Sequence, residues 1–68
     1  HSFTVDEGFH FLNRTIIQSH LGEKYDSIVV AIERNGELIS LGKDTTFQLG
    51  DLVWIVGDRE NIIKILYP

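Results

Sequence analysis

The sequence predicts a two-layer α+β domain, in which two short helices pack beside a mostly antiparallel sheet of about four strands. An uninterrupted apolar run over 28–32 predicts a buried strand. The pair Asn35-Gly36 predicts a tight hairpin. Apolar residues at helical spacing near 16–21 and 62–66 predict two amphipathic helices. Because the chain has 68 residues, we expect a single domain.

The amino-terminal part predicts one strand followed by one helix. Phe3 and Val5 alternate with polar neighbours, which favours a strand over 2–7. Asn13 then offers a side-chain oxygen as the helix N-cap, and Gly22 is a natural helix stop. Since only about two turns fit between them, this helix must depend on packing against the sheet.

The middle of the chain predicts a central strand and its hairpin partner. The segment 27–34 has no polar alternation, so we expect both of its faces to be covered and the strand to lie at the centre of the sheet. Asn35 and Gly36 tolerate positive φ at both central positions of a type I′ turn. Apolar residues within 38–41 then supply the returning strand.

The last third predicts a connection, a strand and a helix. We expect a polar connection over 42–49, with Phe47 and Leu49 pointing into the core. A buried strand over 52–56 follows, and Asp58 is placed to cap a closing helix. The predicted order is therefore strand, helix, hairpin, strand and helix.

Charge and composition exclude several classes of protein. Ten acidic against six basic residues give a net charge of −4, the wrong sign for holding a nucleic-acid backbone, so we expect no nucleic-acid partner. The chain has no cysteine, which excludes zinc sites built on thiolates. The longest apolar run is far shorter than the roughly 20 residues of a membrane-spanning helix.

No arrangement of catalytic or metal-binding residues stands out. The three histidines, His1, His10 and His20, lack close ligand spacing. No serine lies in a Gly-x-Ser-x-Gly elbow, and the glycines form no phosphate-binding cluster. We therefore expect no catalytic residue, no metal, no cofactor and no enzymatic activity.

The predicted strands carry more apolar surface than two short helices obviously cover. An ordinary core between sheet and helices explains most of this surface. An oligomer interface on part of the sheet explains the excess. The sequence favours neither explanation over the other, and the two are compatible.

Arg34 ends the central strand just before the hairpin. An arginine at such a place can hold a phosphate or carboxylate through two parallel hydrogen bonds. From the sequence we favour a solvated arginine paired with Glu33 or Glu37. Asp51 is expected only to form a turn with Gly50.

Three stretches together resemble a known family. IVVAIERNGE (28–37), followed after a polar loop by GDLVWIVG (50–57), resembles the TrkA-C or RCK-C domain, the C-terminal regulatory domain of K⁺ conductance regulators. FLNRTI (11–16) is similar to the segment that leads into the family's first helix. Two positions depart from the family's usual pattern: Leu41-Gly42 stands where the family often has a proline, and Asn13 replaces its usual glycine.

The resemblance implies a single regulatory domain over 1–68, cut from a longer K⁺ channel, K⁺ uptake system or cation/H⁺ antiporter. It implies a homodimer in the cytoplasm, tethered to the inner or plasma membrane through that membrane transport protein. Some family members bind cyclic di-AMP or another nucleotide between protomers. Carried over by position, this implies four ligand-binding residues: Ile32, Arg34, Asn35 and Leu41. A dimerisation module without a ligand is the alternative.

Overall fold

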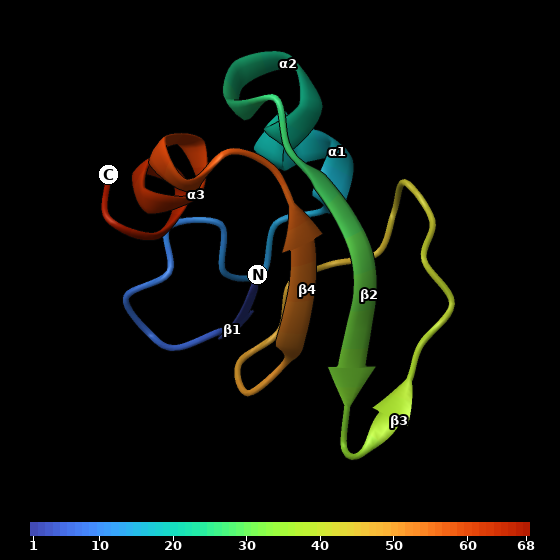
Figure 1. Ribbon diagram of the computed structural model, residues 1–68. Helices are drawn as coiled ribbons and strands as arrows, with labels where there is room; N and C mark the ends of the chain where they lie inside the picture. Colours follow the sequence, from blue (N-terminus) through green and yellow to red (C-terminus); the bar gives the residue numbers. More distant parts are fainter.

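The computed structural model describes residues 1–68 and confirms the predicted fold class (Figure 1). The elements are β1 (Ser2–Thr4), α1 (Ile16–Ser19), α2 (Leu21–Tyr25), β2 (Ile28–Arg34), β3 (Glu37–Leu38), β4 (Leu52–Val56) and α3 (Arg59–Leu66). The strands form one sheet in the order β1-β4-β2-β3, and every neighbouring pair is antiparallel. The longest helix, α3, has 8 residues, and none of the helices could span a membrane.

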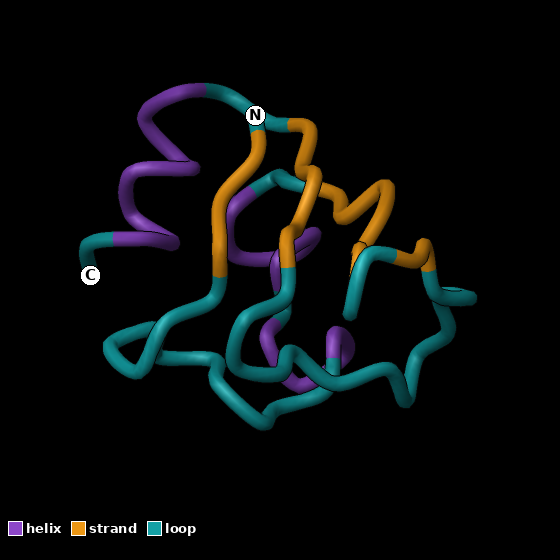
Figure 2. Tube along the Cα trace, turned by 90° about the horizontal axis from the view of Figure 1, so that it is seen from below, coloured by secondary structure: helices purple, strands orange, loops and turns teal.

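The hydrophobic core lies on one face of the sheet, here called the inner face. Antiparallel partners point to the same side, so Ile32 opposite Val53 and Val29 opposite Ile55 mark this face. Helices and loops cover it, and Figure 2 shows the strands side by side with most of the loop backbone gathered along one side of them. The buried apolar residues are Val5, Phe9, Leu21, Ile32, Phe47, Val53, Ile55, Ile62 and Ile65.

β2 lies inside the sheet as predicted, but only one of its faces is covered. The pairing with β4 shifts by one residue between Val29 and Ala31, so Val30 forms a β-bulge. Ile28 and Val30 are exposed whereas Ile32 is fully buried. Within this chain, the expectation of two covered faces is therefore wrong, because Ile28 and Val30 lie on a face that no other element of the chain covers.

The predicted first helix is two short helices with a different start. Thr15, not Asn13, is the N-cap, because Thr15 and Gln18 form a reciprocal capping box. Asn13 instead has a left-handed backbone with φ of 64°. The helix is interrupted at His20, where φ is 52°, and Gly22 lies inside α2 rather than after it.

The hairpin between β2 and β3 is confirmed. Asn35 and Gly36 have φ of 54° and 81°, as a type I′ turn requires. In the connection that follows, Phe47 is fully buried as predicted. Leu49 is 59% exposed, contrary to the prediction, because it lies at the tip of a turn that the Asp51 N–H closes onto the preceding chain.

β1 joins the sheet from the first residue and pairs with the strand farthest from it in sequence. The amino group of His1 donates to the Ile55 carbonyl oxygen at 3.1 Å, across 54 positions of sequence. The strand ends at Thr4, earlier than the predicted residue 7. It ends there because the Asp6 carboxylate accepts a hydrogen bond from the Gly8 N–H and forms a turn.

Candidate functional site

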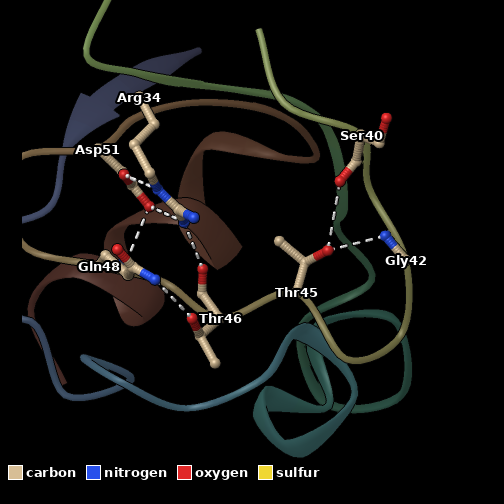
Figure 3. Close-up of polar contacts among 7 residues, drawn as sticks. All are labelled: Arg34, Ser40, Gly42, Thr45, Thr46, Gln48 and Asp51. Atoms are coloured by element: carbon tan, nitrogen blue, oxygen red, sulfur yellow. Dashed lines mark hydrogen bonds and ion pairs between the residues drawn. The ribbon is translucent and has the colours of Figure 1, made fainter. Parts of the chain in front are cut away.

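Arg34 and Asp51 form an ion pair at one end of the inner face. The Nε of Arg34 donates to Oδ1 of Asp51 at 2.9 Å, and Nη2 donates to Oδ2 at 2.8 Å (Figure 3). Glu33 lies opposite Leu52 in the antiparallel register, so Arg34, the residue after Glu33, lies opposite Asp51, the residue before Leu52. Asp51 is only 1% exposed, so its carboxylate is almost completely removed from water.

The same pair holds the loop that leads into β4. Nη2 of Arg34 also donates to the Thr46 carbonyl oxygen at 2.9 Å, and the Gln48 N–H donates to Asp51 Oδ2 at 2.9 Å (Figure 3). Burial opposes ionisation of Asp51, but the hydrogen bonds from Arg34 and Gln48 outweigh it and hold the pKa of this carboxyl below its ordinary value. The hydrogen bond to Asp51 raises the pKa of Arg34.

The structure corrects the partner that the sequence favoured for Arg34. Neither Glu33 nor Glu37 forms an ion pair with it. Glu33 is directed to the opposite face of β2, because neighbouring residues of a strand alternate. The sequence signal for Asp51 is its position. Asp51 directly precedes β4, and Arg34 is the last residue of β2. An antiparallel pairing of these two strands therefore brings the two side chains together.

Exposed apolar side chains gather on the other face of the sheet, here called the outer face. No helix covers this face, and Trp54 lies near its middle, opposite Ala31 of β2 and Ser2 of β1. The exposed members are Ile28 (65%), Val30 (54%), Val56 (60%) and Leu38 (71%). Because these side chains do not enter the core, the core does not account for all of the apolar surface of the strands.

A hollow of about 380 Å³ lies between the first two helices and the start of β2. Half of its ten lining residues are apolar, and Ile17 and Ile28 are the most exposed of these. Lys43, from the connection after β3, and His20, at the junction of α1 and α2, also line it. The volume falls within the range of small-molecule sites.

The structure does not gather the four residues implied by the resemblance around one hollow. None of them lines any of the hollows in the molecule. Ile32 belongs to the core, since it faces inward opposite a buried valine, and its side chain has no exposed surface for a ligand. Arg34 is half-buried in its ion pair, Asn35 is exposed in the hairpin turn, and Leu41 is exposed in the connection after β3.

Solved structures similar to this chain include those of the protein BusR of S. agalactiae. The RCK_C domain dimer of BusR in complex with c-di-AMP is 27% identical, with a TM-score of 0.78 over 91% of this chain and 83% of that chain. BusR in complex with its busAB-promotor DNA is 24% identical, with a TM-score of 0.81, and this chain spans only 34% of it. No sequence among the curated proteins matches the chain.

The BusR structures overturn the prediction that nucleic acid is not a partner. BusR, a protein that contains this fold, is found in complex with both its busAB-promotor and its busA-promotor DNA. The net charge of −4 describes these 68 residues alone. It says nothing of the other two thirds of such a chain, so the charge argument did not reach the protein as a whole.

The family is settled by the extent of its match. The sequence pattern of the TrkA-C domain matches residues 1–66, which is nearly the whole chain. The antiparallel sheet with helices on one face agrees with the RCK_C domains of the similar structures. The chain therefore belongs to the TrkA-C domain family.

Proposed function

We propose that this domain is the regulatory part of a larger protein, that it pairs with a second copy through the outer face of its sheet, and that the pair binds cyclic di-AMP. The observation that carries the proposal is the apolar outer face, which no element of the chain covers. The c-di-AMP complex of the BusR RCK_C domain dimer, at 27% identity, supports both the dimer and the ligand.

The composition of the outer face suits a second copy of the same chain. Large apolar groups on neighbouring strands form a continuous surface, and contiguous surfaces of this kind on small domains mark interfaces. A two-fold dimer places the same patch on both sides, so an apolar patch meets an apolar patch. Pairing therefore buries side chains such as Val30 and Val56.

The regulatory effect follows from differential binding. A ligand held between protomers shifts the dimer only if it binds one geometry more tightly than the other. The attached protein then senses the change as a shift between two of its own states. We propose that the domain has no enzymatic activity and that its host is a K⁺ or monovalent-cation transport protein, with the domain on the cytoplasmic side of the membrane.

The test measures assembly and ligand binding on the same samples. Sedimentation analysis gives the oligomeric state, and calorimetric titration compares cyclic di-AMP with cyclic di-GMP and ATP. We expect a dimer that binds cyclic di-AMP in preference to the other two. Val30→Lys places a charge on the outer face and should give a monomer that binds more weakly.

Ile63→Lys is the matched control, because Ile63 is exposed on α3 and not on the sheet. It should leave both assembly and binding as in the wild type. A monomer at all concentrations would refute the dimer. A dimer that binds none of the nucleotides would make this domain a dimerisation module only.

A further inference from the structure

We propose that the free edge of β1 pairs with an extended segment of a partner protein, and that a hollow beside this strand receives a lysine or arginine side chain of that segment. The inference goes beyond the proposed function and does not depend on it, because it concerns the side of the sheet rather than the outer face. Figure 1 shows β1 at one side of the sheet, next to β4 and away from β2 and β3.

The backbone of β1 offers unpaired hydrogen-bonding groups along this side. The amino group of His1 and the N–H of Val5 are directed toward β4, where they donate to carbonyl oxygens of β4 and of the residue before it at 3.1 Å and 2.8 Å. Because the direction alternates along an antiparallel strand, the N–H and C=O groups of Ser2 and Thr4 point away from β4. Both residues are exposed. Two donors and two acceptors are therefore available to a further strand.

The edge of β1 lacks the features that usually prevent such pairing. Free edges of natural sheets are protected by charged side chains, prolines or bulges. β1 contains neither a charged residue nor a proline, and its register with β4 is regular. The opposite edge, β3, has only 2 residues, begins with Glu37 and lines none of the hollows. Of the two edges, β1 is therefore the one suited to accept a strand.

A second hollow, of about 300 Å³, lies beside β1. Its lining includes Phe3 and Thr4 of the strand, Phe9 of the following turn, and Leu66 and Tyr67 at the end of α3. Residues that lie opposite each other on neighbouring strands point to the same side of the sheet. A residue of an added strand that lies opposite Phe3 therefore points to the side on which the hollow lies.

The lining of this hollow suits a long basic side chain. Phe3, Phe9 and Tyr67 are aromatic, and the ring centroids of the first two lie 5.3 Å apart. Asp6 is the one charged residue of the lining, and its Oδ1 is positioned by the Gly8 N–H, which donates to it at 2.9 Å. Asp6 takes part in neither ion pair of the chain. Aromatic faces bind the stem and the cation of a lysine or arginine, and the carboxylate binds its charged end.

Charge favours a basic partner over a second copy of β1 as the occupant of this edge. Residues 1–13 contain two carboxylates and no lysine or arginine. A second copy of this stretch would bring acidic groups toward the carboxylate of the hollow and supply no cation for it. The net charge of −4 over the whole chain likewise favours a basic segment.

The experiment uses short blocked peptides that alternate threonine with valine and differ only in their central residue, which is arginine, leucine or glutamate. A fourth peptide keeps the arginine but carries N-methyl groups on both residues that flank it, which removes the donors that would face β1. Each peptide is titrated into the ¹⁵N-labelled domain, and the shifts and hydrogen exchange of the Ser2 and Thr4 amides are followed by NMR.

Two variants test the carboxylate of the hollow. In Asp6→Asn the side-chain oxygen can still accept from the Gly8 N–H, so the turn is kept while the charge is lost. Asp44→Asn is the matched control for the loss of one negative charge, because Asp44 is exposed and lines no hollow. The thermal midpoint of each form without peptide shows whether its fold is intact. If Asp6→Asn unfolds early, the comparison of the arginine and glutamate peptides on the wild type decides the role of charge.

We expect the arginine peptide to shift and protect the Ser2 and Thr4 amides of the wild type, and to bind more tightly than the leucine and glutamate peptides. Asp6→Asn should weaken the arginine peptide by about two- to fivefold, the effect of losing an exposed ion pair, and leave the leucine peptide unchanged. Asp44→Asn should bind all the peptides as the wild type does. The N-methylated peptide should not bind.

Three results would overturn the proposal. Equal binding of the arginine and leucine peptides shows that the hollow does not select a cation. An N-methylated peptide that binds as well as its parent shows that no strand pairing occurs. Protection of the Ser2 and Thr4 amides without peptide, rising with protein concentration, assigns the edge to a second copy. None of these results bears on the binding of cyclic di-AMP or on pairing through the outer face, so the proposed function stands or fails separately.

Discussion

At the scale of single residues, the buried carboxylate of Asp51 decides how the loop before β4 is held. It accepts hydrogen bonds from two groups, the Arg34 guanidinium and the Gln48 N–H, and is itself removed from water. Removing one partner of such a pair is costly, because the other charge remains without compensation. The pair is therefore expected to matter for stability far more than a surface ion pair would.

Asp51→Ala is expected to lower the free energy of unfolding by about 3 kcal/mol, measured by urea denaturation near pH 7. Glu33→Ala and Glu37→Ala, at the positions that the sequence favoured as partners of Arg34, should change it by no more than about 0.5 kcal/mol. The double variant Arg34→Met with Asp51→Leu should recover part of the loss, since it leaves no uncompensated charge. Equal losses in all three single variants would show that the ion pair has no special role.

The lowered pKa of Asp51 also predicts a dependence of stability on acid. An aspartate in the unfolded chain titrates near pH 3.9, and the folded value lies lower. The stabilisation is therefore fully present above about pH 4 and is lost as the pH falls from there through the folded pKa. The difference in unfolding free energy between the wild type and Asp51→Asn should shrink over that range. A difference that stays constant down to the lowest pH would contradict the assignment.

The sequence was informative about Arg34 but not about its partner. An arginine at the end of an apolar strand is a visible signal, and both a ligand role and an ion pair follow from it. The partner depends on which strand lies beside β2, and that pairing joins positions 17 residues apart. From local residue preferences, Asp51 was predicted only to form a turn with Gly50, because such preferences carry no information about the order of the strands.

At the scale of elements, most of the predictions that succeeded rest on local signals, although the local capping box of Thr15 and Gln18 was missed. The Asn35-Gly36 turn, β4 and the closing helix follow from residue preferences, and the structure has all of them. The break at His20 and the bulge at Val30 have no comparable local signal.

The end of β4 and the start of β2 meet closely at Gly57. A Cβ on Gly57 would collide with the side chain and Cα of Ser27, and Ser27 is buried. Gly57→Ala should therefore lower the free energy of unfolding by about 1 to 3 kcal/mol, as overpacking does, in a thermal or urea titration. Combining it with Ser27→Gly should restore part of the loss. If Gly57→Ala alone unfolds at the wild-type midpoint, the two segments do not pack this closely.

At the scale of the whole molecule, the domain is a half-covered sheet. Helices and loops cover the inner face, and the outer face is apolar and open. A domain of this size buries only about 60% of its unfolded surface, so a partner on the open face adds a large share of the burial. Assembly and stability are therefore expected to be linked.

The link predicts that the thermal midpoint rises with protein concentration, because pairing stabilises the folded state by mass action. A dilution series in scanning calorimetry should show the rise for the wild type and for Ile63→Lys, whose added charge lies on α3 and not on the sheet. Val56→Lys, which places a charge on the outer face opposite Ile28, should unfold at a midpoint that does not vary with concentration. A wild-type midpoint independent of concentration would count against pairing through this face.

The pairing of β1 with β4 constrains the order in which the chain can fold as it is made. The contact between His1 and Ile55 spans 54 positions. At a synthesis rate of about 5 to 20 residues per second, the first strand waits roughly 3 to 10 seconds before its partner has even been polymerised. Until then the residues of β1 have no strand to pair with. β1 can therefore join the sheet only after β4 has been synthesised.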